Sequence, residues 1–152
     1  MIRKAKVQDG RDIVELVNYY GEKGVMLPRS LNEIYETIRE FLVYEEDGKV
    51  LGVASVHIDW EDLAEIRSLA VQAGKVGRGI GADLVRECIQ EAQEMGINRV
   101  FSLTYVPEFF MKLGFEIVDK SMFPHKIWGD CVKCPKFPEC DETALIYNID
   151  LD

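Results

Sequence analysis

The glycines at positions 74–81 are the residues whose spacing most clearly points to chemistry. Four of these eight residues are glycine, Lys75 and Arg78 stand among them, and a helical apolar pattern begins at Ile80. The first N–H groups of a helix have no partners within the helix and lie at the positive end of its dipole. Glycines let an anion approach such groups closely. The segment therefore predicts a phosphate-binding loop with Arg78 as a neutralising side chain, although an ordinary glycine-rich turn has the same composition.

A second group of chemically active residues lies in an irregular segment at positions 119–142. Its four metal-ligand side chains span sixteen positions: His125, Cys131, Cys134 and Cys140. Two thiolates separated by two residues hold one metal well, and a third thiolate with an imidazole would complete a tetrahedral zinc site. An iron–sulfur cluster and simple packing of reduced cysteines are the alternatives. Zinc would have a structural role here, because it would close the segment on itself.

Apolar periodicity predicts the elements that must position these groups. Residues 65–71 are typical of a buried strand, and the glycines lead from it into a helix that ends near Met95. Gly96 suits the left-handed residue just past that helix, and Gly114 suits the same position after a short helix at 107–113. The pair Asp47-Gly48 predicts a β-hairpin, and Ser30 with Glu33 predicts a helix start. Further strands are expected at 2–7, 41–45, 50–58, 100–104, 115–118 and 144–149. Further helices are expected after Asp9, which is the predicted N-cap, from Leu31 to Phe41 and at 107–113. This order, βααβββαβαββ, predicts an α+β domain with a mixed sheet.

Length and composition limit the class of protein. The 152 residues are predicted to form one domain, residues 1–152, with the segment 119–142 as an insert within it. The formal charge of −9 argues against nucleic-acid binding, which relies on a basic surface. No apolar run approaches the roughly 20 residues of a membrane span, and the first residues do not resemble a signal peptide. We therefore expect a cytoplasmic protein whose cysteines are reduced or bind metal.

Several stretches of the chain resemble one enzyme superfamily. VGRGIGADLV at positions 76–85 resembles the pyrophosphate-binding motif of the GNAT superfamily of acyl-CoA-dependent N-acetyltransferases, with Val76 where the pattern has Gln or Arg. EFFMKLGF at 108–115 is similar to the superfamily's closing motif. Residues 27–43 and 64–71 look like the acetyltransferase domain of N-acetylglutamate synthases, in particular the short stand-alone versions.

The resemblance implies a fold, a co-substrate and a coenzyme site. The fold would be the GNAT-like acyl-CoA N-acyltransferase fold, an α+β arrangement in which helices flank a mixed, mostly antiparallel sheet. Acetyl-CoA would be the co-substrate, with its pantetheine amides along a strand and its pyrophosphate at the glycine loop. The backbone groups implied are those of Leu69, Ala70 and Val71 for the pantetheine, and of Gly77, Arg78, Gly79, Ile80, Gly81 and Ala82 for the pyrophosphate.

Three charged side chains are expected to serve the acceptor amine. Glu65 stands where the superfamily's carboxylate lies, and it would accept a proton through a water molecule unless it is a solvated or salt-bridged strand-end carboxylate. Arg67 follows two residues later, so a regular strand places both on one face, where Arg67 would hold an acceptor carboxylate or pair with an acid. Arg29 lies in a segment that borders the amino-acid site of the resembling enzymes, and a surface arginine is its alternative.

The group that protonates the leaving thiolate is not evident. Phe110 stands where many superfamily members have a tyrosine, and a phenylalanine cannot donate a proton, so packing is its expected role. Tyr105 is a weak substitute, and water is sufficient for a thiolate. His57 could act as a base near neutral pH, although we expect a structural histidine.

Together these observations predict an acetyl-CoA-dependent amino-acid N-acetyltransferase, with L-glutamate as acceptor and arginine biosynthesis as its pathway. Its partners would be two small molecules, acetyl-CoA and an amino acid, with a homodimer left open and neither nucleic acid nor membrane involved. An acetyltransferase for another small amine and a non-catalytic acyl-CoA-binding sensor are the alternatives. Acceptor choice depends on a few loop side chains, so the sequence alone does not decide between them.

Overall fold

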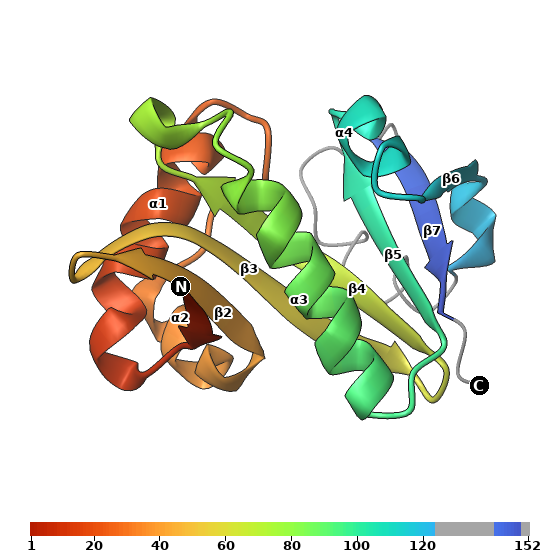
Figure 1. Ribbon diagram of the computed structural model, residues 1–152, viewed down its shortest axis with the longest axis horizontal. Coiled ribbons are helices and arrows are strands. Elements are labelled where there is room, and N and C mark those ends of the chain that lie inside the picture. Colours follow the sequence, from red (N-terminus) through yellow and green to blue (C-terminus); the bar gives the residue numbers. More distant parts are fainter. Residues whose placement is uncertain (124–141, 150–152) are drawn as a thin grey trace. The chain divides into compact units, whose positions relative to one another are not determined.

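The elements of the chain follow the order expected from the sequence (Figure 1). The computed structural model describes residues 1–123 and 142–149. The strands are β1 (Ile2–Lys4), β2 (Phe41–Glu46), β3 (Lys49–Trp60), β4 (Leu63–Val71), β5 (Arg99–Thr104), β6 (Glu116–Val118) and β7 (Thr143–Asn148). The α-helices are α1 (Gly10–Glu22), α2 (Leu31–Glu36), α3 (Ile80–Glu94) and α4 (Pro107–Met111). The 3-10 turns are η1 (Val7–Asp9), η2 (Ile38–Glu40), η3 (Ala73–Lys75) and η4 (Lys120–Met122).

The strands form a mixed sheet in the order β1-β2-β3-β4-β5-β7-β6. β4 and β5 are parallel, whereas the pairs β1–β2, β2–β3, β5–β7 and β6–β7 are antiparallel. A parallel pair needs a crossover connection, and α3 supplies it between β4 and β5. The mostly antiparallel, mixed sheet predicted from the sequence is thereby confirmed.

The chain divides into two compact units. The first contains Met1–His57 and Ile66–Glu91, and the second contains Ile58–Glu65 and Ala92–Asp152. Since their boundaries fall within β3, β4 and α3, each of these elements contributes residues to both units.

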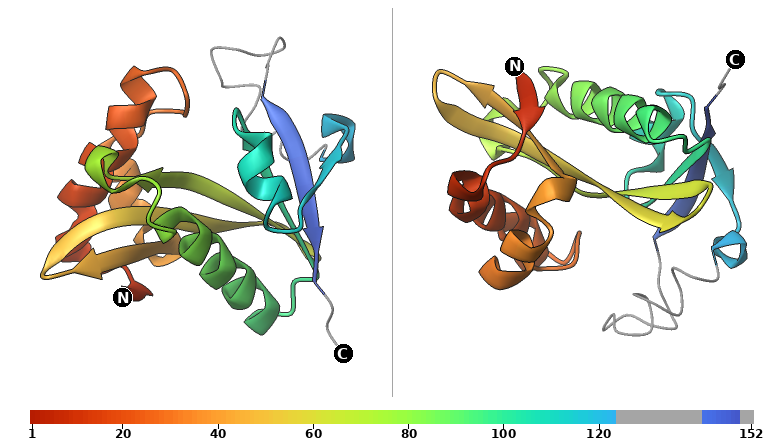
Figure 2. Two further views of the ribbon diagram at one scale, coloured as in Figure 1. Left: turned by 45° about the horizontal axis from the view of Figure 1, so that its top comes forward. Right: turned by 90° about the horizontal axis from the view of Figure 1, so that it is seen from below.

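In the first unit, α1 and α2 cover one face of the strands and α3 covers the other (Figure 2). The core on the α1 and α2 side is formed by the buried residues Ile13, Val17, Ile34, Phe41, Val43, Val53 and Ala70. On the opposite face, Gly52 lies beneath α3. A Cβ atom at Gly52 would lie 2.8 Å from Ile80 Cγ2 and 3.0 Å from Leu84 Cδ1. Glycine at this position therefore allows α3 to approach β3 closely.

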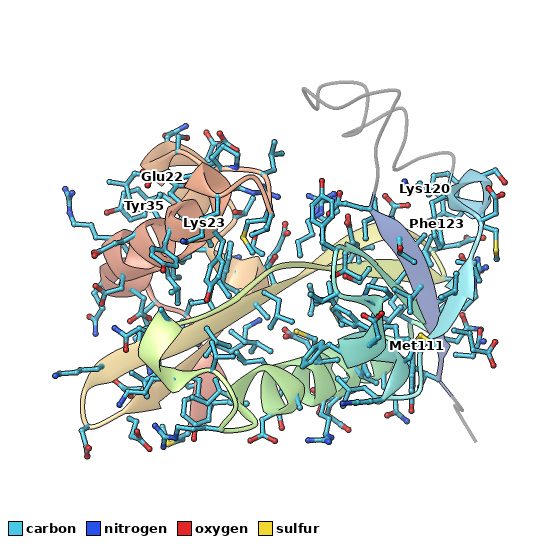
Figure 3. The ribbon with its side chains drawn as sticks, turned by 90° about the horizontal axis from the view of Figure 1, so that it is seen from above. Glu22, Lys23, Tyr35, Met111, Lys120 and Phe123 are labelled. Carbon is cyan, nitrogen blue, oxygen red and sulfur yellow. The ribbon has the colours of Figure 1, made fainter. Side chains whose placement is uncertain are left out.

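In the second unit, aromatic side chains pack on both faces of β5 and β7. On one face, Phe110 from α4 contacts Phe115 at a ring-centroid distance of 5.1 Å, and Phe115 contacts Tyr147 at 5.3 Å. On the other, Phe101 stacks on Phe123 at 4.0 Å. Phe123 follows η4 and is labelled in Figure 3. The two faces result from the alternation of side chains along each strand.

Several local predictions are confirmed by backbone geometry. Asp47 and Gly48 both have positive φ values, 52° and 77°, as a two-residue hairpin turn requires. Gly96 and Gly114 follow α3 and α4 with φ values of 85° and 98°, which is the left-handed conformation expected past a helix end. Each of these conformations could be predicted from the residues next to it in the sequence.

The ends of three predicted elements are corrected. The first strand stops at Lys4 instead of reaching Val7, because Val7 already belongs to η1. The second helix stops at Glu36, and Phe41 begins β2 instead of continuing the helical stripe. Asp9 does not cap α1 with its side chain. Its carboxylate instead accepts hydrogen bonds from the Arg3 guanidinium at 2.8 and 2.9 Å.

Candidate active site

The glycine loop forms an open approach to the start of α3. Gly77 and Gly79 have φ values of 94° and 83°, and a Cβ atom built on either would meet nothing within 4 Å. The Gly79 carbonyl accepts the Asp83 N–H at 3.0 Å, which is the first hydrogen bond of the helix. The N–H groups of residues 80–82 precede that bond and have no helical acceptor. The loop therefore offers backbone donors to an anion, with open space beside Gly77 and Gly79.

Arg78, in the middle of this loop, is paired with a carboxylate. Its guanidinium donates to both oxygens of Glu46, at 3.1 and 2.9 Å. This guanidinium lowers the pKa of the Glu46 carboxyl, and the carboxylate raises the pKa of Arg78. A phosphate bound by Arg78 would either share the guanidinium with the Glu46 carboxylate or displace that carboxylate.

The end of β4 departs from a regular strand. Ser68 has a positive φ of 53°, which is uncommon for a residue other than glycine. The Arg67 carbonyl next to it accepts a hydrogen bond from the Ser55 hydroxyl at 3.1 Å. At the end of the strand, the Val71 carbonyl accepts the Tyr20 hydroxyl of α1. Of the three residues predicted to line the pantetheine, Val71 thus already has a side-chain partner on its carbonyl.

Glu65 is a buried carboxylate on an otherwise apolar stretch of β4. Its side chain is 4% exposed, between Ala64 and Ile66, which are also buried. This burial excludes the alternative of a solvated strand-end carboxylate. Arg67 is half-buried two residues later, and the left-handed backbone at Ser68 comes after both residues. Glu65 belongs to the second unit, whereas Arg67 and the glycine loop belong to the first.

Arg29 is held against α1 by its backbone. Its N–H donates to Asn18 Oδ1, and its carbonyl accepts from Asn18 Nδ2, both at 2.8 Å. Ser30 follows as the cap of α2, and its hydroxyl accepts the Glu33 N–H at 3.1 Å, as predicted. The Arg29 Nε atom is buried and has no hydrogen-bond partner in the part of the chain that the structure describes.

Phe110 and His57, which were considered for chemistry, and the thiol of Cys88 all lie in structural surroundings. Phe110 is 2% exposed and makes edge-to-face contacts with Phe109 and Phe115, as expected for packing. His57 Nδ1 lies 3.0 Å from Glu40 Oε1, which agrees with the expected structural histidine. Cys88 is fully buried in α3, and burial raises the pKa of its thiol. This thiol is thus neutral and part of the core.

The predicted metal ligands His125, Cys131, Cys134 and Cys140 lie outside the described residues. Within residues 1–123 and 142–149, no group of three or more His, Cys, Asp or Glu side chains could hold a metal ion. Over the same ranges, none of the helices has the length and hydropathy needed to cross a membrane.

Four residues near the predicted site were not found from the sequence. Asn18, Tyr20 and Glu46 each contact a predicted site residue from a distant part of the chain, at sequence separations of 11, 51 and 32. Ser68 adopts a conformation that its residue type does not favour. Only Asn18 carried a signal, because asparagine is a poor residue for a helix interior.

Comparisons with known proteins agree with this arrangement. The family model described as "Acetyltransferase (GNAT) family" matches residues 14–115. An uncharacterized N-acetyltransferase of Chlorobaculum tepidum is 40% identical over 148 residues, which is 97% of this chain and 96% of that protein. An amino-acid acetyltransferase of Mycobacterium tuberculosis is 38% identical over 122 residues, covering 78% and 70% of the two chains.

Two solved structures are also similar. A Mycobacterium tuberculosis protein in complex with CoA and NLQ has a TM-score of 0.85 and 29% identity, and the match covers 99% of both chains. N-acetylglutamate synthase from Neisseria gonorrhoeae, complexed with coenzyme A and N-acetyl-glutamate, has a TM-score of 0.90 and 28% identity. That match covers 99% of this chain but 35% of the synthase. With its mixed sheet, its glycine loop before α3 and a family match over most of its length, this chain belongs to the acetyltransferase (GNAT) family.

Proposed function

We propose that this acetyltransferase transfers the acetyl group of acetyl-CoA to the α-amino group of L-glutamate, in the cytoplasm, as a step of arginine biosynthesis. The observation that carries the proposal is the open glycine loop that connects β4 to α3. Family membership and relatives named amino-acid acetyltransferase favour an enzyme over a non-catalytic sensor. The gonococcal synthase complexed with N-acetyl-glutamate supports glutamate as the acceptor.

The coenzyme would be held mainly by backbone groups. The N–H groups between Gly77 and Ala82 would bind the pyrophosphate, aided by the positive end of the α3 dipole. Backbone groups of Leu69, Ala70 and Val71 would pair with the pantetheine amides. Positively charged Lys75 and Arg78 would offset the phosphate charge locally, which matters because the whole chain has a net charge of −9.

The chemical step joins an amine nitrogen to a thioester carbonyl carbon. Glu65 would accept a proton from the acceptor ammonium through a water molecule, leaving a neutral amine that attacks the carbonyl. Collapse of the tetrahedral intermediate breaks the C–S bond and releases the thiolate of CoA. The attacking nitrogen loses its second proton as the amide forms. Water carries that proton to the thiolate, because neither Phe110 nor its ring neighbours carry an acidic proton. The proton accepted through Glu65 returns to solvent. Positioning and electrostatics would supply most of the rate.

The acceptor would be recognised by its carboxylates. Arg29 has a buried Nε donor without a partner among the described residues, and Arg67 is half-buried on β4. Guanidinium groups match carboxylates in a bidentate geometry. Two such groups favour a dicarboxylic amino acid over a polyamine or a protein lysine.

Thiol release from acetyl-CoA, measured across a panel of amino acids and small amines, tests the proposal. We expect L-glutamate to have a higher kcat/KM than glutamine, lysine or a polyamine. A faster reaction with a polyamine or a lysine side chain would instead identify an acetyltransferase for another amine. Release of thiol with none of them would contradict the proposed reaction itself.

We also propose a structural zinc ion at His125, Cys131, Cys134 and Cys140, which lie outside the described residues. Acetyl transfer from a thioester to an amine needs no Lewis acid, so the ion would stabilise the protein without entering the reaction. Elemental analysis of untagged protein purified without chelator should find about one zinc per chain. Freely titratable thiols and a stability indifferent to chelator would indicate that these cysteines hold no metal.

A further inference from the structure

The side chain of Asn18 binds both backbone hydrogen-bonding groups of Arg29. The two hydrogen bonds between them, both 2.8 Å, join the side-chain amide of Asn18 to the N–H and the C=O of the same residue. One planar amide therefore satisfies both backbone groups of Arg29 and fixes where its Cα lies relative to α1. A helix-interior asparagine with both amide groups engaged in this way has a role beyond helix formation.

The segment before Arg29 lies against the C-terminal end of α1; Glu22, the last residue of α1, and Lys23, which follows it, are labelled in Figure 3. A Cβ atom at Gly21 would lie only 3.0 Å from the Cα and Cβ of Pro28. The Val25 N–H donates to the Tyr20 carbonyl at 3.3 Å. These contacts place the segment against the C-terminal end of α1, next to the hydrogen bonds between Asn18 and Arg29.

One donor of the Arg29 side chain is also unsatisfied. Its Nε is buried and lacks a hydrogen-bond partner within residues 1–123 and 142–149. A buried donor without an acceptor is unfavourable, and more so when it belongs to a charged group. A carboxylate is the ligand that fits best, because it matches the fork of the guanidinium and supplies the missing acceptor.

The same turn of α1 also contacts the strand proposed to line the coenzyme. Tyr20, two residues after Asn18, donates its hydroxyl to the carbonyl of Val71. Burial raises the pKa of this hydroxyl, so it remains a donor at neutral pH. One helical turn is thus hydrogen-bonded to both the Arg29 segment and the end of β4.

We propose that Asn18 is a positioning residue that holds Arg29 in place to bind a carboxylate of the acceptor amino acid. The inference rests on the proposed function and names the residue that sets affinity for the acceptor. Both amide groups of Asn18 bind the Arg29 backbone, so Asn18 would act on the acceptor only through Arg29. Its loss should therefore weaken acceptor binding and leave acetyl-CoA binding and the chemical step largely unchanged.

The test compares Asn18→Leu and Asn18→Ala with the wild-type protein in steady-state kinetics. We expect the KM for glutamate to rise about tenfold or more, since a displaced hydrogen bond to a charged group has that effect. The KM for acetyl-CoA and the kcat at saturating glutamate should stay within about threefold. Asn32→Leu is the matched control, because Asn32 makes one exposed side-chain hydrogen bond, to Glu36 at 3.0 Å.

A double-mutant cycle separates positioning from simple stabilisation. If Asn18 acts through Arg29, Asn18→Ala should have no further effect on the glutamate KM in an Arg29→Gln background. Two amides of glutamate, the α-amide and the γ-amide, each lack one of its carboxylates. For the amide that lacks the carboxylate held by Arg29, the preference for glutamate, measured as a ratio of kcat/KM values, should fall in both single variants. A lower melting temperature with unchanged KM and unchanged ratios would overturn the inference.

The same data distinguish this failure from failure of the proposed function. Wild-type activity on glutamate with no change of KM in the Asn18 variants overturns the positioning role alone. A wild-type protein that acetylates only amines without a carboxylate overturns both, and one that releases no thiol overturns the proposed reaction. Additive effects of Asn18→Ala and Arg29→Gln would show that Asn18 acts by another route.

Discussion

At the scale of single residues, the proposed chemistry depends most on Glu65. Glu65 is 4% exposed and lies between the buried residues Ala64 and Ile66. Such burial is common where an acid or base is needed for catalysis. Burial leaves two of the expected roles for Glu65, a base that acts through a water molecule and a salt-bridged carboxylate.

Replacing Glu65 by glutamine keeps the size of the side chain but removes the base. We expect kcat to fall about 10²- to 10⁴-fold near neutral pH, the usual effect of a general base. The loss should shrink as the pH rises, because the acceptor amine then loses its proton without help. The measurement is kcat against pH for both proteins, with Glu61→Gln as control, since Glu61 is exposed in the turn before β4. A flat, pH-independent ratio near one would remove Glu65 from the mechanism.

The ion pair between Asp9 and Arg3 should make the free energy of unfolding depend on pH. The Arg3 guanidinium, at 2.8 and 2.9 Å, holds the pKa of the buried Asp9 carboxyl below its usual value. Since the folded pKa is depressed, this stabilisation is fully present above the unfolded pKa of about 3.9 and is lost as the pH falls below it. Asp9→Asn should lower the free energy of unfolding by about 2 kcal/mol at pH 7. Urea unfolding should show that difference diminishing as the pH approaches 3; a constant difference would contradict the argument.

Residues whose roles depend on neighbours in sequence were predictable, and residues whose roles depend on distant contacts were not. The left-handed glycines Gly96 and Gly114 follow helices directly, so local rules identified them. Arg78 was predicted as a phosphate ligand, but its pairing with Glu46 joins positions 32 residues apart. The Asn18 contact with Arg29 depends on how the connecting segment folds back on α1. The spacing of apolar residues in the sequence does not predict that path.

At the scale of elements, the helix α3 and its preceding loop were predicted closely because several local signals agree. The apolar stripe, the glycines before it and Gly96 after it each mark the same boundaries. The helix α2 was overestimated, because its apolar stripe continues into β2. Phe41 and Ile34 both belong to the core of the first unit, one from a strand and one from a helix. The apolar pattern alone therefore does not distinguish the end of the helix from the start of the strand.

The glycine loop allows a matched comparison of two glycines at α3. Gly79 before the helix and Gly96 after it have φ values of 83° and 85°, and a Cβ atom at either would meet nothing within 4 Å. Alanine at either position should lower the free energy of unfolding by about 1–2 kcal/mol, because both conformations are left-handed. Only Gly79→Ala should weaken acetyl-CoA binding, by about tenfold or more, since its methyl group would occupy the space offered to the phosphate.

Isothermal titration of acetyl-CoA into both folded variants makes the comparison. Equal affinities in Gly79→Ala, Gly96→Ala and the wild-type protein would contradict a coenzyme site at this loop. Equal losses in both alanine variants would attribute the effect to general destabilisation instead.

At the scale of the whole molecule, the crossover between β4 and β5 distinguishes this fold from an antiparallel meander. The sequence predicted a mixed sheet, because a strand, a loop and a helix in succession favour a crossover. It did not specify that β7 lies between β5 and β6, since β7 is the last strand in the chain. Such non-sequential pairing depends on long-range packing, including the stack of Phe101 on Phe123.

Coenzyme binding should stabilise the whole protein. A ligand that binds only the folded state adds about 2.7 kcal/mol at a concentration of 100 Kd, which should raise the melting temperature by about 5–10 °C for a chain of this size. The formal charge of −9 disfavours non-specific binding of an anionic coenzyme, so a shift of this size indicates a specific site. Acetyl-pantetheine is the matched ligand, because it keeps the thioester and the amides but lacks the pyrophosphate. If backbone donors at the glycine loop supply much of the affinity, acetyl-pantetheine at the same concentration should give a much smaller shift in differential scanning calorimetry. Equal shifts from the two ligands would place the affinity elsewhere and leave the loop without its proposed role.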